Sequence, residues 1–381
     1  MRIAYIHQLP LEIYPPATNA LAIFARQVGW QVRAWSSANR KGLPPYAATG
    51  VVVMRPAYPG PLVGSGRRLA GFLRWHWGVA SELASWRPDV VMSVEPHSAL
   101  AVWLYYRFYG GSARLMIHHH EYYAPADFLK PGSRTSRWCH HFEMSYLFAR
   151  AEWISQTNSA RLTLMQADCA AVTAAKGRVW PNHPPAQWSA RAKHGMVESA
   201  QPAGSPLRLI YVGSLSFEDT FVRELIEWVA AHPGKVSLHV CGHNVRPDVW
   251  AWIESLDSGH VSTNPAGCAY DELPELMMRF DVALVLYKGN TLNFVHNVPN
   301  KAVEALVCGL EVWYPQEMTA MVGLHRQFPA LRLREVDFRR LPADLARAAG
   351  SRAGIDPPAL SSEAAIQPLL QVLNPACTHE S

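Results

Sequence analysis

The chain has 381 residues, of which 49% are hydrophobic and 17% charged, and its net charge at pH 7 is +5. This apolar fraction excludes an intrinsically disordered chain, and the glycines and prolines show no period that would indicate collagen. The length predicts two domains. The six cysteines contain no C-x-x-C pair, which predicts reduced thiols in a cytoplasmic protein.

The sequence contains no candidate membrane-spanning helix. Its longest apolar run covers 99–106, whereas a spanning helix needs about 20 residues. The first residues, M-R-I-A-Y-I-H, turn polar too early for a signal peptide. We therefore expect a cytoplasmic protein, and docking on the inner face of the membrane stays open.

Charge is distributed unevenly along the chain. Residues 1–200 contain 21 Lys and Arg against 10 Asp and Glu, and residues 201–381 contain 14 against 20. A basic half is suited to nucleic acid, anionic lipid or a phosphorylated ligand, and it is equally suited to an ordinary solvated face. No nucleic-acid motif accompanies the charge, so we expect no nucleic-acid partner.

The first half alternates short apolar runs, typical of buried parallel strands, with helical stretches. Thr18 or Asn19 is expected to cap the first helix, which Gly29 would end. This alternation predicts a parallel sheet with helices on both faces. The expected strands are 2–7, 31–35, 51–54, 89–94, 114–117 and 152–156, and the expected helices are 18–28, 67–86, 97–109, 134–150 and 158–167.

A proline-rich stretch over 181–206 separates this half from a second alternating pattern, which predicts a domain boundary. We expect two doubly wound, Rossmann-like α/β domains at 1–185 and 207–350, a linker at 186–206 and a C-terminal segment at 351–381. Ligands of such sheets bind outside the carboxyl ends of the strands, so the cleft between the two domains is the expected site. The second domain's expected strands are 207–212, 236–241, 282–286 and 311–314, and its expected helices are 220–231, 249–256, 273–280 and 299–308.

The most informative segment is Y-K-G-N-T-L-N-F-V-H-N-V-P-N-K-A-V-E-A-L-V-C-G, residues 287–309. Asn297 is the expected N-cap of a helix with Pro299 in its first turn, and Lys301 and Glu304 share one face of that helix. A helix start near Lys288 and Lys301 favours an anion, and Glu304 can accept two hydroxyl hydrogens from one sugar ring. Phosphate and a vicinal diol together describe a nucleotide. A capped surface helix with one salt bridge explains the same residues.

The string P-N-K-A-V-E-A-L-V-C-G-L-E-V, residues 299–312, resembles the P-N-K-x-x-E-x-x-x-x-G-x-x-V signature of GT-B glycosyltransferases of the retaining family 4 type. The resemblance implies that the second domain binds a nucleotide-sugar donor and that Glu304 holds the donor ribose. It places Asn297, Asn300 and Lys301 by the diphosphate and sugar. Y-V-G-S-L at 211–215 is similar to the glycine turn that opens the donor domain, which implicates Gly213 and Ser214.

Two stretches of the first half also resemble this family. H-H-H-E-Y-Y-A-P at 118–125 is similar to the loop of the acceptor-side domain that faces the cleft, which makes His120 and Glu121 the candidate catalytic residues. V-W-P-N-H-P-P at 179–185 is similar to the interdomain linker. By the same resemblance, the segment 351–381 would return to the first domain, and the alternative is that it hangs loose.

The sequence departs from the family pattern at two places. Many members carry a basic pair after the glycine turn, where this chain has the acidic stretch S-L-S-F-E-D-T-F, so Lys288, Lys301 or Arg223 would have to contact the diphosphate. The commoner two-glutamate pattern needs Glu at 296, where this chain has His296. A histidine does not replace a carboxylate as a hydrogen-bond acceptor for two hydroxyls.

Two further patterns have competing explanations. The histidines at 118–120 and 140–141 favour zinc only if they converge, but adjacent residues after a strand point to opposite faces, so we expect no metal site. The stretch R-R-L-A-G-F-L-R-W-H-W-G, residues 67–78, fits either a helix that lies on a membrane surface or an ordinary helix. The ordinary helix would pack on the sheet through Leu69, Phe72, Leu73 and Trp77.

The expected function is sugar transfer from a nucleotide-sugar donor to a glycan or lipid-linked acceptor, in cell-surface polysaccharide or glycolipid synthesis. The resemblance implies retention of the anomeric configuration and no cofactor. No D-x-D motif is present, and helix-terminal amides with lysine would stabilise the leaving diphosphate without a metal. A peripheral contact with anionic membrane accompanies this expectation. The alternatives are a nucleotide-sugar epimerase or hydrolase of the same fold, and a non-catalytic binding or scaffold protein.

Overall fold

The computed structural model describes residues 1–38, 44–57, 65–189, 205–242, 244–256, 258–347 and 360–374. The chain forms two compact units, Met1–Asn182 with Ile366–Ser381, and His183–Ala365. Most of the expected linker and Cys377 lie outside the described residues. The described cysteines are free thiols, and no described helix is long and apolar enough to cross a membrane.

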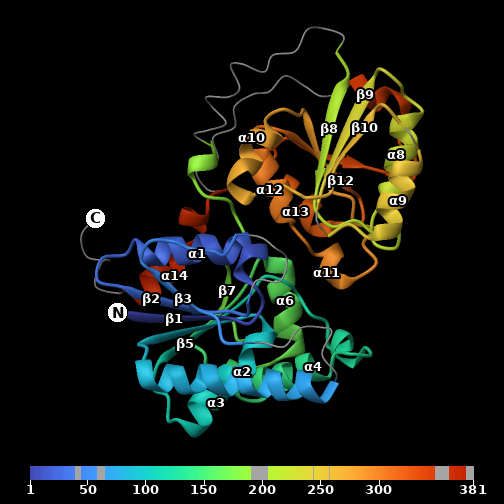
Figure 1. Ribbon diagram of the computed structural model, residues 1–381. Helices are drawn as coiled ribbons and strands as arrows, with labels where there is room; N and C mark the ends of the chain where they lie inside the picture. The colour runs from blue at the N-terminus through green and yellow to red at the C-terminus, as the bar shows by residue number, and fades with distance from the viewer. Residues whose placement is uncertain are drawn as a thin grey trace. The chain divides into compact units, whose positions relative to one another are not determined.

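The first unit is built on a parallel seven-stranded sheet in the order β3-β2-β1-β4-β5-β6-β7. Helix α1 lies on one face of this sheet, and α2, α3 and α4 lie on the other (Figure 1). The strands are β1 (Arg2–His7), β2 (Gln31–Trp35), β3 (Val51–Met54), β4 (Val90–Val94), β5 (Arg114–His119), β6 (Trp153–Gln156) and β7 (Gly177–Val179). The α-helices are α1 (Pro15–Ala25), α2 (Ser65–Trp86), α3 (Ala99–Phe108), α4 (Arg134–Phe142), α5 (Phe148–Arg150) and α6 (Ser159–Asp168).

Short helical turns and the C-terminal helix complete the first unit. Helix α14 (Ser362–Leu373) runs from the second unit into the first, where Arg114 Nη2 donates a hydrogen bond to the Val372 carbonyl at 3.0 Å. The short 3₁₀ turns lie at Leu11–Ile13, Pro96–Ser98 and Pro125–Leu129. A single π-helical stretch, Glu143–Leu147, joins α4 to α5, so the helix expected over 134–150 is interrupted.

The expected cap of the first helix is wrong. Helix α1 begins at Pro15, with Tyr14 as its N-cap, and ends at Ala25. Proline is favoured in the first turn because its missing N–H has no partner there in any case. Thr18 therefore lies inside the helix, where its hydroxyl donates to the Pro15 carbonyl at 2.9 Å.

The second unit is built on a parallel six-stranded sheet in the order β10-β9-β8-β11-β12-β13. Successive side chains of a strand face opposite sides, so Leu209 and Tyr211 pack with α8 and α9, whereas Ile210 packs with α10 and α12 (Figure 1). The strands are β8 (Leu207–Val212), β9 (Val236–Cys241), β10 (Val261–Asn264), β11 (Val282–Leu284), β12 (Glu311–Pro315) and β13 (Leu333–Val336). The helices are α8 (Val222–Ala230), α9 (Pro247–Ser255), α10 (Leu273–Met277), α11 (Leu292–Val295), α12 (Asn300–Val307) and α13 (Thr319–Gln327), with 3₁₀ turns at Tyr270–Glu272 and Ala343–Arg347.

Three strands were not expected from the sequence. β7, β10 and β13 have three or four residues each, and at least half of each strand is not buried. Such segments lack the continuous apolar run by which a buried parallel strand is recognised. All three are edge strands of their sheets. The central strands, which position the site, are the ones that the sequence predicts.

Candidate functional site

Each sheet has one place where the strand order reverses, and ligands of doubly wound sheets bind at the carboxyl ends of the strands there. In the first unit this place lies between β1 and β4, which pair through Ile3–His7 and Val90–Val94. In the second unit it lies between β8 and β11. The residues that follow these four strands are therefore the first candidates for ligand contacts in each unit.

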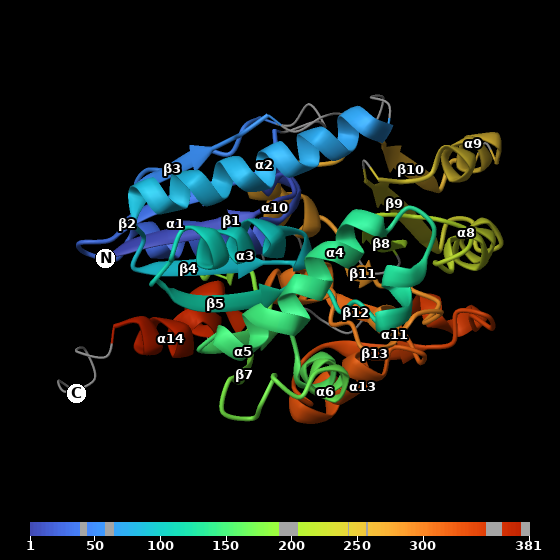
Figure 2. The ribbon, with the colours of Figure 1, turned by 90° about the horizontal axis from the view of Figure 1, so that it is seen from below.

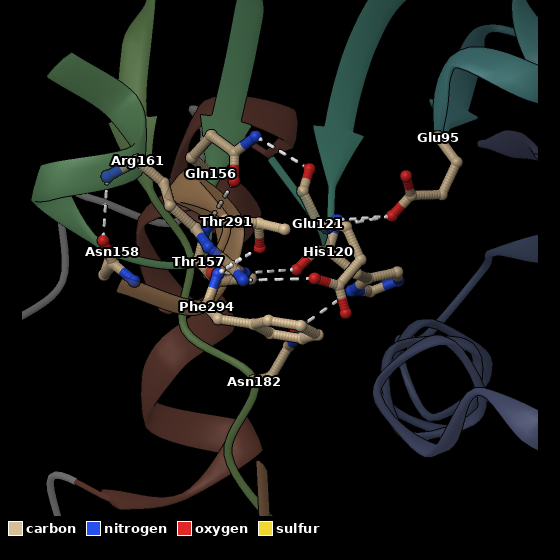
Figure 3. A network of polar contacts seen from close by, with 10 residues as sticks. All are labelled: Glu95, His120, Glu121, Gln156, Thr157, Asn158, Arg161, Asn182, Thr291 and Phe294. Carbon is tan, nitrogen blue, oxygen red and sulfur yellow. Dashed lines mark hydrogen bonds and ion pairs between the residues drawn. The ribbon is translucent and has the colours of Figure 1, made fainter. Parts of the chain in front are cut away.

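Glu95 directly follows β4 and is 1% exposed. Its backbone has φ 62° and ψ 150°, a region that residues other than glycine rarely adopt, and such strain is found mainly at functional sites. Its carboxylate Oε1 accepts the backbone amides of His120 at 2.6 Å and Glu121 at 3.2 Å (Figure 3). Burial raises the pKa of the Glu95 carboxyl to about 7, with His119 lowering it and Glu121 raising it.

His120, just after β5, lies in a chain of hydrogen bonds that determines which of its nitrogens carries the proton. Its Nδ1 is 3.0 Å from Asn182 Oδ1, an acceptor, and 3.2 Å from His118 Nε2. The Ser155 hydroxyl donates to the Ile117 carbonyl at 3.2 Å, so His118 Nδ1, 2.9 Å from that hydroxyl, is the donor of this contact and His118 Nε2 is an acceptor as well. His120 thus carries its proton on Nδ1, and Nε2 keeps a lone pair.

The His120 ring is buried and neutral. Burial lowers the pKa of His120 to about 4, against the opposing hydrogen bond to Asn182. Its Nε2 is buried and has no hydrogen-bond partner among the described residues. The His120 ring lies near the rings of His7 and Tyr14, at 6.2 Å between centroids in both cases. A neutral imidazole with a lone pair accepts the hydrogen of a hydroxyl group.

Glu121 is held by a buried arginine. Arg161 is 1% exposed and its Nη2 lies 3.1 Å from Glu121 Oε2, whereas the Glu121 side chain is 43% exposed (Figure 3). Arg161 Nη1 also donates to the His120 carbonyl at 2.9 Å and to the Thr157 hydroxyl at 3.1 Å. Gln156 Nε2 donates to the Glu121 carbonyl at 3.1 Å. The backbone of 120–121 is therefore held from β4, β6 and α6 at once.

His119 points to the other side of the sheet, where it pairs with Glu143. Its Nε2 pairs with Glu143 Oε1 at 2.8 Å, and His140 Nδ1 lies 3.6 Å from Glu143 Oε2. Burial alone would raise the pKa of Glu143, but the two histidines lower it to about 2. The described residues contain no group of three His, Cys, Asp or Glu side chains placed to hold a metal ion. Glu143 and His119 form a buried ion pair.

The glycine turn of the second unit follows β8. The Gly213 amide donates to the Cys241 carbonyl at 3.0 Å, and Gly213 has φ 152°. A Cβ atom placed on Gly242 would lie 2.1 Å from the Gly213 carbonyl oxygen, so the turns after β8 and β9 approach too closely for a side chain. The Tyr211 hydroxyl donates to the Ser214 carbonyl at 2.6 Å and holds the turn in place.

The expectation for the face of α12 is correct, and the expectation for its cap is wrong. Lys301 Nζ donates to Glu304 Oε2 at 2.7 Å, and Glu304 is 2% exposed. The Lys301 ammonium also lies 5.4 Å from the centre of the Tyr270 ring. The N-cap of α12 is Pro299. Asn297 instead follows α11, and its backbone amide donates to the Phe294 carbonyl at 3.2 Å. The residues just before Asn297 form a separate short helix, α11, which the Thr291 hydroxyl caps by accepting the Phe294 amide hydrogen (Figure 3).

Lys288 is engaged with the acidic stretch that follows the glycine turn. Its Nζ donates to the Phe217 carbonyl at 2.9 Å and lies 3.6 Å from Glu224 Oε1. The Asn290 side-chain amide Nδ2 donates a hydrogen bond to Asp219 Oδ1 at 2.8 Å. The Arg223 guanidinium lies 4.7 Å from the centre of the Phe217 ring. Two of the three basic residues expected to replace the missing pair, Lys288 and Arg223, therefore contact this loop.

The remaining sequence candidates lie on the same edge of the second sheet. Asn300 is the first residue of α12. His296 ends α11, and its Nδ1 is 3.3 Å from the Thr319 hydroxyl. Sequence reasoning missed Glu95, Arg161 and Asn182 in the first unit. Of these three, only Glu95 carries a visible signal in the sequence, because it is a lone carboxylate directly after the mostly apolar strand β4.

No protein-family model and no curated protein matches this chain. Solved structures do match over nearly the whole chain. HepE of Anabaena, in complex with UDP and glucose, matches with a TM-score of 0.67 at 14% identity, over 98% of this chain and 100% of that one. An α,α-trehalose-phosphate synthase (UDP-forming) from Burkholderia vietnamiensis has a TM-score of 0.62 at 12% identity, over 99% and 97%. Sucrose-phosphate synthase from Thermosynechococcus elongatus has a TM-score of 0.60 at 14% identity, over 98% of both chains.

These TM-scores over nearly the full length of the chains establish a shared fold. Two parallel Rossmann-like sheets occur in one chain, and the similarity covers both of them. The α/β fold expected from the sequence is confirmed, and the chain has the GT-B fold of these glycosyltransferase structures.

Proposed function

We propose that the chain is a glycosyltransferase that moves a sugar from a nucleotide-sugar donor to a glycan or a lipid-linked acceptor. The observation that carries this proposal is the Lys301–Glu304 pair, held in the first two turns of α12 at the reversal edge of the second sheet. The HepE structure, which shares the fold, contains UDP and glucose. We further propose a role in cell-surface polysaccharide or glycolipid synthesis, with retention at the anomeric carbon.

On the donor side, Glu304 would accept hydroxyl hydrogens from the ribose. A carboxylate offers about four lone pairs, and Lys301 occupies one of them, so acceptor capacity remains. The start of α12 at Asn300 would face the diphosphate, since helix N-termini favour anions. Because Cys241 already accepts the Gly213 amide hydrogen, a phosphate contact from the glycine turn would come from Ser214 or a following amide.

Positive charge near the diphosphate would come from Lys301, while Lys288 would first have to leave Phe217 and Glu224. Asn297, which lies between α11 and α12, would contact the donor sugar or diphosphate with its amide side chain. Helix-terminal amides and one lysine stabilise charge on a leaving diphosphate. We therefore propose transfer without a cofactor or a bound metal.

On the acceptor side, His120 Nε2 would accept a hydroxyl hydrogen at neutral pH, because the ring is neutral there. Glu121 would bind substrate through the exposed part of its carboxylate while Arg161 fixes its position. Glu95 is a positioning residue, because it holds the amides of both.

One second function is favoured by a specific observation. Lys288 already contacts Phe217, in the acidic stretch after Gly213, and Glu224. This arrangement is expected of a chain that has lost its contacts with a phosphate. This favours a non-catalytic binding or scaffold protein with the GT-B fold.

A product assay separates these functions. The purified chain is incubated with UDP-, GDP-, ADP- and CMP-sugars, with and without a lipid and glycan extract, and the products are identified by mass spectrometry. A transferase releases the nucleotide only with the extract, and Glu304→Gln lowers this release. Isomerised donor, or nucleotide release without acceptor, indicates an epimerase or a hydrolase. Unchanged donor under every condition contradicts the proposal and supports the scaffold.

A further inference from the structure

An exposed apolar surface lies on α2 and at the end of α3. Leu69, Leu73 and Trp77 follow one another at four-residue spacing along α2 and are 39%, 46% and 51% exposed. Phe108 and Tyr109, at the end of α3, are 57% and 37% exposed. Exposed apolar residues are common singly, but a contiguous group marks an interaction site.

These five residues form one surface, which we call the α2–α3 patch. The Trp77 ring centre lies 5.9 Å from that of Phe108 and 6.1 Å from that of Tyr109. The two helices run side by side on the same face of the first sheet (Figures 1 and 2). Trp103 extends the aromatic contact, with its ring centre 5.6 Å from that of Phe108.

The packing of α2 on the sheet does not need the patch. Phe72, Trp75, Val79 and Leu83 are all 3% exposed or less and form the buried side of this helix. Of the four residues expected to pack on the sheet in the ordinary-helix alternative, Phe72 does so, and the expectation is wrong for Leu69, Leu73 and Trp77. Trp75, two residues before Trp77, occupies the core position.

The charges around the patch are positive. Arg67, Arg68 and Arg74 on α2 are exposed, and so is Arg107 on α3, whose guanidinium lies 5.6 Å from the centre of the Phe108 ring. Neither 65–81 nor 96–120 contains an Asp or Glu. Glu82, the acidic residue of α2, accepts the Trp35 indole hydrogen at 2.6 Å.

We propose that the α2–α3 patch docks this protein on the surface of an anionic phospholipid bilayer. Trp and Tyr rings favour the headgroup level, leucine side chains enter the acyl boundary, and arginine pairs with lipid phosphate. Basic residues without neighbouring carboxylates complement the negative charge of anionic lipids. The proposal requires neither donor binding nor catalysis, and it gives a lipid-linked acceptor a route to the first unit.

Vesicle sedimentation tests this docking with the full chain and no nucleotide. The wild type should pellet with vesicles of phosphatidylcholine and phosphatidylglycerol, and much less with phosphatidylcholine alone or at high salt. Leu73→Ser/Trp77→Ser/Phe108→Ser and Arg68→Glu/Arg74→Glu should each bind the mixed vesicles at least about tenfold more weakly. The matched control is Leu256→Ser/Arg279→Glu, which changes exposed residues of the second unit and should bind as the wild type does.

Far-UV circular dichroism and melting temperature confirm that each variant is folded. Failure of the wild type to bind anionic vesicles overturns the proposal, and so does equal binding by the patch variants. A wild-type dimer that the triple serine variant converts to a monomer, without vesicle binding by either, assigns the patch to a second copy of the chain instead. Nucleotide binding is measured separately, so failure of the docking leaves the donor site untouched.

Discussion

The Glu95 carboxylate accepts the backbone amide hydrogen of His120 at 2.6 Å, although 25 positions separate the two residues in the sequence. Two parallel strands place them together, because β4 pairs with β5 and both residues follow the ends of these strands. The contact joins the buried carboxyl group of Glu95, whose backbone has a positive φ, to the loop that carries His120 and Glu121. It connects the geometry of the candidate acceptor side to a group whose pKa lies near neutrality.

Glu95→Gln should remove a pH dependence of stability. Burial raises the folded-state pKa of Glu95 to about 7, so its contribution to stability is greatest below the unfolded pKa and is lost as the pH rises through 7. The glutamine oxygen can still accept both amides. We expect the free energy of unfolding of Glu95→Gln, relative to the wild type, to be about 2–3 kcal/mol more favourable at pH 8 than at pH 5. Urea unfolding at both values measures this, and an equal difference at both contradicts it.

His76→Leu should stabilise the protein most in mild acid. His76 is fully buried between Phe72 and Trp75, and neither ring nitrogen has a hydrogen-bond partner among the described residues. Burial lowers its pKa to about 3, so its neutral form costs stability as the pH falls below the unfolded value of 6.5. We expect His76→Leu to raise the free energy of unfolding by about 2 kcal/mol more at pH 5 than it does at pH 7.5. The exposed control His141→Gln should show no such difference in urea unfolding.

Lys301→Met should leave the buried Glu304 carboxylate unpaired. We expect a loss of about 1–3 kcal/mol in the free energy of unfolding, below the value for fully buried pairs because Lys301 is 31% exposed. Lys301→Met/Glu304→Gln should regain most of that stability, since no unpaired charge remains. Nucleotide binding should be lost in Lys301→Met and should not return in the double variant. Denaturant unfolding and calorimetric titration measure the two effects, and recovery of binding with stability would show that Glu304 acts only in folding.

Gly242→Ala should disturb the glycine turn after β8. The new Cβ would lie 2.1 Å from the Gly213 carbonyl oxygen, which is backbone and has to move. We expect a destabilisation of about 1–3 kcal/mol together with weaker nucleotide binding. Gly259→Ala is the matched control, because a Cβ there meets no atom within 4 Å. Equal melting temperatures for the two variants would contradict the close approach of the two turns.

The sequence predicts the parts of the fold that depend on local patterns. The strands β1, β4 and β8 are predominantly apolar, and the spacing of Lys301 and Glu304 places them on one face of α12. The sequence predicts the bounds of α12 to within one residue, but its N-cap was misplaced to Asn297 because the chain inserts the short α11 before Pro299. Turn geometry of this kind depends on tertiary packing and not on the capping propensity of Asn297.

The hydrogen-bond network around His120 and Glu121 could not be predicted in the same way. Arg161 contacts Glu121 across 40 positions, and Asn182 contacts His120 across 62. Such contacts follow from strand order, which the alternation of elements does not specify. The positive φ of Glu95 gives no signal in a stretch, E-P-H-S, that contains no glycine.

A thermal-shift screen with UDP, GDP, ADP, CMP and their sugar conjugates tests the central claim, a donor site built on α12. A ligand at 100 times its dissociation constant stabilises a protein by about 2.7 kcal/mol, which raises the melting temperature measurably. The account predicts a shift with one nucleotide and its conjugates for the wild type and for the Leu256→Ser/Arg279→Glu control, and no shift for Glu304→Gln. An unchanged melting temperature with every nucleotide, or an equal shift in Glu304→Gln, would contradict it.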